Sequence, residues 1–160
     1  MDLETLAQEI GHSLTQRGLV LATAESCTGG WAAQAVTSSA GSSLWFERGF
    51  ITYSNLAKQE LLGVAGATLA EYGAVSEATA RAMAEGALKH SRAQVALAIT
   101  GVAGPAGGST EKPVGTVWVA WAGAGRSTRA EQYHFTGGRE EVRRQAVEAA
   151  LRGLLRFLEA

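Results

Sequence analysis

The chain has 160 residues, of which 46% are hydrophobic and 18% are charged, and its 14 basic and 15 acidic side chains give a formal net charge of −1. This composition excludes a disordered protein, and the near-neutral charge argues against a nucleic-acid partner, because nucleic-acid binders usually carry a basic excess. The single cysteine, Cys27, excludes an intrachain disulfide and a zinc site of several cysteines. Because the sequence shows no signal peptide and no apolar run of ~18 residues, we expect a cytoplasmic protein with no membrane partner.

Helices and strands are expected to alternate along the chain, and no repeat or linker divides residues 1–160, so we expect a single domain. Helical spacing of apolar residues, serine caps and closing glycines mark the helices, and short apolar runs mark the strands. The expected helices cover residues 3–14, 31–36, 54–62, 68–72 and 76–88 and a last segment after 137–138, and the expected strands cover 19–24, 50–53, 95–100, 116–122 and 126–135. Helical crossovers between the first three strands favour a parallel core, and the last two strands form an antiparallel hairpin. The prediction is an α/β fold, a three-layer α/β/α sandwich with a mixed, mainly parallel sheet.

Polar residues follow each of the first three predicted strands at equivalent places. Ser26 follows the first strand, Tyr53 ends the second and Thr100 ends the third. If these strands are parallel, the three residues share the carboxyl edge of the sheet, where open α/β sheets bind ligands. The alternative is that polar residues simply end the strands, but three such stretches together favour a binding site.

Two glycine-rich stretches extend this edge. Residues 26–30 open a helix whose free N–H groups and dipole favour an anion. Thr28, Gly29 and Gly30 are therefore candidate contacts for a phosphate or carboxylate, with an ordinary capped turn as the alternative. Residues 101–115 form a long loop with five glycines, and long loops inside a compact domain are often functional. Neither stretch carries a Walker or dinucleotide-binding motif, so no nucleotide cofactor is expected.

Lys58 is the candidate general base. With Ser54 as N-cap it lies in the first turn of a helix, where the dipole lowers the pKa of a cation, and partial burial would lower that pKa further. A neutral lysine can deprotonate a hydroxyl nucleophile, and Tyr53 is close enough in sequence to hydrogen-bond the same site. A solvated surface lysine is the alternative. The histidines show no metal-ligand spacing, so no metal site is expected, and Cys27 has no obvious histidine partner and is expected to be a small buried residue.

Several motifs occur in a fixed order along nearly the whole chain. They are Thr23-Ala24-Glu25-Ser26-Cys27-Thr28-Gly29-Gly30, Gly41-Ser42-Ser43, residues 46–50, residues 52–55 with Lys58, and residues 73–77, 100–105 and 111–117, followed by Phe135, Gly138, Arg139 and Arg143. Together these motifs resemble the CinA C-terminal domain family, in the form that lacks the molybdopterin-binding-like domain of some members. So many ordered motifs are more specific than a single glycine-rich loop.

The resemblance implies a metal-independent amidohydrolase without a cofactor, which converts nicotinamide mononucleotide and water to nicotinate mononucleotide and ammonia. It also implies a serine/lysine mechanism assisted by tyrosine, and a homodimer. The catalytic residues carried over are Ser26, Ser43, Tyr53 and Lys58, and the expected substrate contacts are Thr28, Gly29, Gly30, Thr100, Gly101, Gly104 and Arg139. Gly138 stands where the family often has an acidic residue.

The sequence leaves two choices open. Ser26 at a strand end and Ser43 in a polar loop are both candidates for the nucleophile. The competing functions are a non-catalytic nucleotide-binding or competence-associated partner module, and a different amidase or phosphate-ester hydrolase that uses the same pocket. Nucleotide salvage and a link to DNA uptake are both compatible physiological roles.

Overall fold

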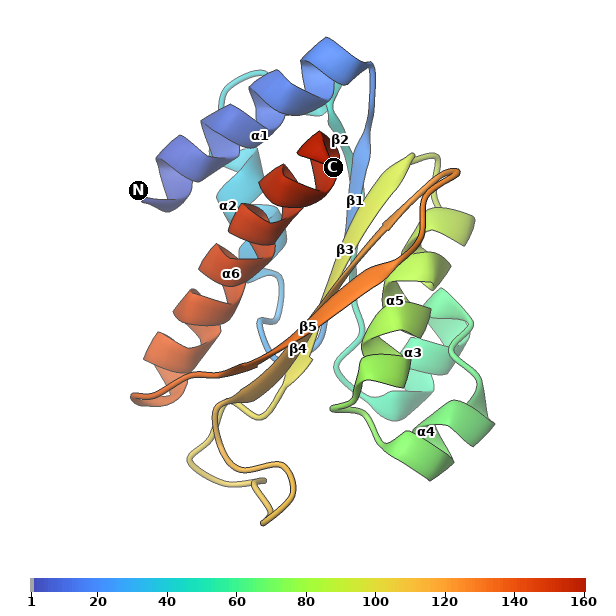
Figure 1. Ribbon diagram of the computed structural model, residues 1–160, viewed down its shortest axis with the longest axis vertical. Helices are drawn as coiled ribbons and strands as arrows, with labels where there is room; N and C mark the ends of the chain where they lie inside the picture. The colour runs from blue at the N-terminus through green and yellow to red at the C-terminus, as the bar shows by residue number, and fades with distance from the viewer. Residues whose placement is uncertain (1) are drawn as a thin grey trace.

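A five-stranded mixed sheet runs through the computed structural model, which describes residues 2–160 (Figure 1). Its strands are β1 (Leu21–Glu25), β2 (Phe46–Ile51), β3 (Val95–Gly101), β4 (Thr116–Gly123) and β5 (Arg129–His134). They lie in the order β2-β1-β3-β4-β5, with β1 parallel to both β2 and β3, and with β4 antiparallel to both β3 and β5. The predicted parallel core and antiparallel hairpin are confirmed.

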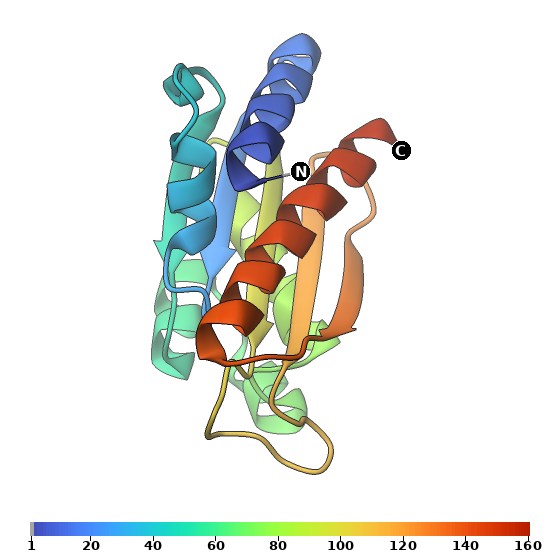
Figure 2. The same ribbon diagram turned by 90° about the vertical axis from the view of Figure 1, so that its left-hand side faces the viewer.

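Helices cover both faces of the sheet and form the three predicted layers (Figures 1 and 2). The helices are α1 (Leu3–Arg17), α2 (Trp31–Thr37), α3 (Asn55–Leu62), α4 (Gly66–Tyr72), α5 (Glu77–Lys89) and α6 (Arg139–Glu159), and the 3₁₀ turn η1 is Ser42–Leu44. One face carries α1, α2 and α6, and the other carries α3, α4 and α5. The hydroxyls of Ser54 and Ser76 cap α3 and α5 as predicted, and Gly18 ends α1 in the left-handed conformation. Within residues 2–160, none of these helices has the length and apolar sequence needed to cross a membrane.

The two faces of the central strands carry side chains of different size. On β3, Leu97 and Ile99 join the core formed with α1 and α6, whereas Ala96 and Ala98 join the core formed with α5. Alternate residues of a strand point to opposite faces, so this pattern places large side chains on one side and small ones on the other. The small alanine side chains allow α5 to pack close to the sheet.

The second strand begins and ends earlier than predicted. It spans Phe46–Ile51 instead of 50–53, so Tyr53 follows the strand and does not end it. β2 is an edge strand that pairs only with β1. An edge strand has only one neighbouring strand and tolerates polar residues such as Glu47 and Arg48. Because of these residues, β2 does not form the continuous apolar run by which strands were predicted.

A buried tryptophan packs against a glycine of α6. The Trp121 indole N–H donates to the Ala150 carbonyl at 2.9 Å, and a Cβ added at Gly153 would overlap the Trp121 ring. The side chain of Trp121 is buried and belongs to the core on the α1 and α6 side of the sheet.

Candidate active site

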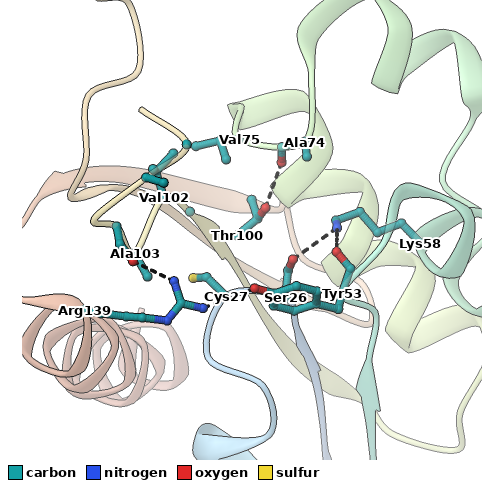
Figure 3. Close-up of a pocket in the computed structure, with 14 residues that line it drawn as sticks. Ser26, Cys27, Tyr53, Lys58, Ala74, Val75, Thr100, Val102, Ala103 and Arg139 are labelled. Carbon is teal, nitrogen blue, oxygen red and sulfur yellow. Dashed lines mark hydrogen bonds between the residues drawn. The ribbon is translucent and has the colours of Figure 1, made fainter. Parts of the chain in front are cut away.

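The carboxyl ends of β1 and β3 open into a cavity of about 280 Å³ (Figure 3). This volume is just below the usual range for ligand pockets, ~300–1,000 Å³. The predicted site residues in its lining are Ser26, Tyr53, Lys58, Thr100, Gly101, Gly104 and Arg139. Residues that are far apart in the sequence therefore meet at the edge that the parallel strands predicted.

The amine of Lys58 lies at the centre of these contacts. Its Nζ is 3.1 Å from Ser26 Oγ, 3.0 Å from the Thr52 carbonyl oxygen and 3.2 Å from the Tyr53 carbonyl oxygen. The side chain is only 1% exposed, so the alternative of a solvated surface lysine is wrong. Burial lowers the pKa of Lys58 below its ordinary value of 10.5, because a charged amine loses its hydration inside the protein.

The uncharged form of this amine can also satisfy all three contacts. A neutral amine has two N–H donors and one lone pair. When the carbonyls of Thr52 and Tyr53 accept the two N–H groups, the lone pair is left for the Ser26 hydroxyl, which then donates its proton to Nζ. An amine placed in this way can act as a general base toward a serine nucleophile.

Ser26 begins a closed turn. Its N–H donates to the Ile99 carbonyl at 3.0 Å, which continues the pairing of β1 with β3, and its carbonyl accepts the N–H of Gly29 at 3.1 Å. The next N–H, that of Cys27, donates to no other residue within 2–160, and Cys27 lines the cavity. The N–H directly after a nucleophilic serine can stabilise an oxyanion.

The prediction of an anion site at the start of α2 is wrong, because a carboxylate of the chain itself occupies that position. Glu25 Oε1 accepts the Thr28 hydroxyl at 2.6 Å and the Ala32 N–H at 2.8 Å. Glu25 Oε2 accepts the Ala33 N–H at 3.0 Å. Glu25 precedes the N-cap Gly30 by five residues, so its side chain reaches the helix start through the turn, and a negative charge there is stabilised by the helix dipole.

The three predicted ligand contacts in this turn do not line the cavity. Thr28 is fully buried and donates its hydroxyl to Glu25. Gly29 and Gly30 have φ of 59° and 107°, so they are glycines because the turn needs the left-handed region. Close approach of a ligand is not the reason for glycine at these positions.

Ser43 lies away from this cavity. It is part of η1, which precedes β2, and the Trp45 carbonyl accepts the N–H of Leu21 at the start of β1. Because β1 and β2 are parallel, Ser43 sits at the amino edge of the sheet, whereas Ser26 sits at the carboxyl edge. A six-residue strand at about 3.3 Å per residue separates the two edges by about 20 Å. Of the two candidate serines, Ser26 is the one at the cavity.

Tyr53 and Arg139 form the mouth of the cavity (Figure 3). Arg139, in the first turn of α6, donates from Nη1 to the Gly104 carbonyl at 2.7 Å and from Nη2 to the Tyr53 hydroxyl at 3.2 Å. Lys58 contacts Tyr53 through the backbone carbonyl of the tyrosine and not through its hydroxyl. The Tyr53 side chain, 63% exposed, is thus available to a ligand at the entrance.

Thr100 and the long loop form the opposite wall. The Thr100 hydroxyl donates to the Ala74 carbonyl at 2.8 Å, which ties the end of β3 to the segment before α5. In residues 2–160, the N–H groups of Gly104 and Gly107 take part in no hydrogen bond, and both glycines line the cavity. These groups can donate to oxygen atoms of a bound molecule.

Cys27 is buried, as predicted, although it also lines the cavity. Burial raises the pKa of its thiol to about 12, so it is a poor nucleophile at neutral pH. No group of three or more His, Cys, Asp or Glu side chains in the described part of the chain is placed to hold a metal ion.

Comparisons with known proteins place these observations in a family. The family described as "CinA C-terminal domain" matches residues 3–158. The chain is 54% identical to the nicotinamide-nucleotide amidohydrolase PncC of Escherichia coli K12, over 96% of this chain and 93% of that protein. It is also 54% identical to a longer CinA-like protein of Syntrophobacter fumaroxidans, over 97% of this chain and 36% of that one. The crystal structure of the competence/damage inducible protein CihA from Agrobacterium tumefaciens superposes with a TM-score of 0.96 at 47% identity, covering 100% of this chain and 97% of that one.

Proposed function

Because the chain belongs to the CinA C-terminal domain family, we propose that it is a nicotinamide-nucleotide amidohydrolase, which converts nicotinamide mononucleotide and water to nicotinate mononucleotide and ammonia. The observation that carries the proposal is the buried amine of Lys58, 3.1 Å from Ser26 Oγ at the wall of the cavity. The 54% identity to the E. coli amidohydrolase, over 96% of this chain, supports the choice of substrate.

In the first half of the reaction, Ser26 is the nucleophile. Lys58 Nζ takes the hydroxyl proton as Oγ attacks the carboxamide carbon, which forms a tetrahedral intermediate. The C–N bond then breaks, and the ammonium of Lys58 returns the proton to the departing nitrogen, which leaves as ammonia. The product of this half is an ester between Ser26 and the nicotinoyl group.

In the second half, a water molecule replaces ammonia. Lys58 takes a proton from the water, and the resulting hydroxide attacks the ester carbon. The bond to Ser26 Oγ breaks, the serine regains a proton from Lys58, and nicotinate mononucleotide leaves. In both halves the N–H of Cys27 donates to the oxygen on which negative charge develops.

The phosphate of the nucleotide needs donors at the mouth of the cavity. Arg139 uses two of its five N–H groups on Gly104 and Tyr53, so others remain for phosphate oxygens. The unpaired N–H groups of Gly104 and Gly107 lie on the same loop and add further donors. These groups replace the start of α2 as the proposed anion-binding region, and the exposed Tyr53 ring borders it.

Ammonia release from nicotinamide mononucleotide, measured with a chelator present, tests this function. The wild type should turn over at the same rate with and without the chelator. Ser26→Ala should lose nearly all turnover and still bind the nucleotide in calorimetry. Ser43→Ala should keep its turnover, and loss of activity in this variant alone would overturn the choice of nucleophile. A well-folded wild type that binds the nucleotide without releasing ammonia would favour a non-catalytic binding module.

We also propose a homodimer that works in the cytoplasm. Exposed apolar side chains occur at both ends of β2 and on α3, with Leu44 before the strand, Ile51 at its end, and Leu56 and Leu61 on the helix. An unpaired strand edge beside apolar surface is suited to association with a second copy. Light scattering during gel filtration should give twice the monomer mass for the wild type and a monomer for Ile51→Glu combined with Leu56→Glu. A monomeric wild type at micromolar concentration would contradict the dimer.

A further inference from the structure

Glu25 has a buried carboxylate that the proposed reaction does not use. The residue is 1% exposed, and its side chain accepts hydrogen bonds from the Thr28 hydroxyl and from the N–H groups of Ala32 and Ala33. None of these four residues lines the cavity, so the carboxylate does not contact a substrate there. By accepting from three donors, it fixes the turn from β1 into α2, and Ser26 is the first residue of that turn.

The backbone of Glu25 reaches the lysine side of the site. Its carbonyl accepts the N–H of Thr52 at 2.8 Å, which continues the pairing of β1 with β2. The carbonyl of Thr52 in turn accepts from Lys58 Nζ at 3.0 Å. Glu25 therefore connects the turn that carries the serine with the segment that orients the lysine, and a rotation at this residue changes the distance between Ser26 Oγ and Lys58 Nζ.

Arg143 of α6 donates hydrogen bonds to two carbonyl groups of the same turn. Its Nε donates to the Cys27 carbonyl at 3.0 Å, its Nη2 donates to the Thr28 carbonyl at 3.3 Å, and its guanidinium lies 5.6 Å from the centre of the Trp31 ring. Glu25 accepts hydrogen bonds from groups that follow Ser26 in the chain. Arg143 donates hydrogen bonds to carbonyl groups that also follow Ser26. The Cys27 N–H donates to no other residue of the range 2–160 in this arrangement.

We propose that Glu25 is a positioning residue for the reaction, whose carboxylate holds Ser26 Oγ within hydrogen-bond distance of Lys58 Nζ by closing the turn from β1 into α2. The inference rests on the proposed function, because it takes Ser26 as the nucleophile. The competing explanation is a helix cap without catalytic consequence. A cap of that kind predicts lower stability and an unchanged kcat for each folded molecule.

Three variants separate these explanations by steady-state kinetics. In Glu25→Gln the amide oxygen can accept two of the three hydrogen bonds, but its NH₂ group would face the N–H of Ala33, so kcat should fall about 10-fold. Glu25→Ala removes all three acceptor contacts, and kcat should fall about 100-fold. KM should stay within about twofold in both, because the substrate contacts lie on other elements. Thr28→Val removes one donor, keeps the carboxylate and should reduce kcat less than Glu25→Ala does.

Leu14→Ala is the matched control. Leu14 is a fully buried residue of α1 that does not line the cavity, so its truncation lowers the melting temperature without altering the turn. The control should keep the wild-type kcat. If Glu25→Gln and Glu25→Ala also keep the wild-type kcat while losing stability, Glu25 is a structural cap and the proposal is overturned.

A second readout does not depend on the nucleotide. A fluorophosphonate labels an activated serine, with fluoride as the leaving group, and intact mass gives the rate at Ser26. The Glu25 variants should label more slowly in the same order as their kcat values, and labelling at the wild-type rate would refute positioning. A wild type that labels at Ser26 and releases no ammonia would remove the proposed function, while the labelling ratios still decide the role of Glu25. A wild type that does neither would overturn both proposals.

Discussion

Replacing Lys58 by methionine tests whether the fold holds a buried, uncharged amine. Methionine keeps most of the length and the apolar stem of lysine, and it removes the amine that three oxygen atoms contact. Because the side chain is buried, the folded protein lowers the pKa of this amine below 10.5. Between the lowered pKa and 10.5, the unfolded chain carries a proton on Lys58 that the folded protein lacks.

This difference in protons sets the sign of the pH dependence. Stability rises with pH wherever the unfolded state binds more protons, with a slope of about 1.4 kcal/mol per pH unit for one proton. The contribution of Lys58 is least favourable below the lowered pKa, where both states are protonated. It improves as the pH rises and levels off at 10.5, the ordinary value. The methionine variant lacks this contribution, so the free energy of unfolding of the wild type minus that of Lys58→Met should increase with pH inside this window.

Urea unfolding followed by tryptophan fluorescence, from about pH 7 to about pH 10, measures this difference. Other titrating groups largely cancel, because both proteins contain them. The difference should climb by up to about 1.4 kcal/mol for each pH unit inside the window, and the variant should have no turnover. A difference that stays flat or falls with pH would mean that the folded protein keeps the amine charged, and a neutral lysine base would then be refuted.

Four further outcomes follow from the structure. Thr23→Val should raise the free energy of unfolding by about 1 kcal/mol in urea titrations, because the buried Thr23 hydroxyl has no hydrogen-bond partner in the described residues; a loss of stability would contradict this. Gly153→Ala should lower it by about 2 kcal/mol, because the added methyl overlaps the Trp121 ring. Cys27→Ala should keep its turnover, and iodoacetamide should not inactivate the wild type, since the thiol pKa is raised to about 12. The value of kcat/KM should rise with pH through the lowered pKa of Lys58, and a profile that falls there would contradict a neutral base.

Most elements could be predicted because local signals agree with the final packing. The glycine at position 18 ends α1, and serines at 54 and 76 cap the helices that follow them. The apolar runs of β1 and β3 reflect strands covered by helices on both faces, so nearly every residue in them is buried. These signals, together with the order of elements, were enough to place Ser26 and Thr100 at one edge of the sheet.

The prediction failed where a side chain's hydrogen-bond partner is distant in the sequence, or where an element lies at the edge of the sheet. β2 was placed too late because an edge strand does not need a continuous apolar run. The anion site at α2 was predicted because the free N–H groups of a helix start are visible in a sequence, whereas the direction of the Glu25 side chain is not. Ser43 and Ser26 are separated because Ser43 precedes β2 and β2 runs parallel to β1. This separation can be inferred only when the bounds of β2 are known.

The burial of Lys58 had a signal in the sequence. Leu62 follows it by one helical turn and is buried, so the two side chains share the face of α3 that packs inward. A lysine on the apolar face of a short amphipathic helix is a stronger indication of function than its distance from the helix N-cap. Spacing alone leaves a surface lysine as the alternative, because charged side chains are seldom fully buried.

Two opposing effects act on Lys58, and the site depends on which of them is larger. The carbonyls of Thr52 and Tyr53 would accept more strongly from an ammonium than from an amine, which favours the charged form. Burial favours the neutral form, and no carboxylate forms a salt bridge with Lys58 within residues 2–160. The buried carboxylate of Glu25 directs its oxygens to Thr28 and the start of α2. Since those donors occupy the carboxylate, it does not pair with Lys58, and burial can dominate at the amine that faces Ser26.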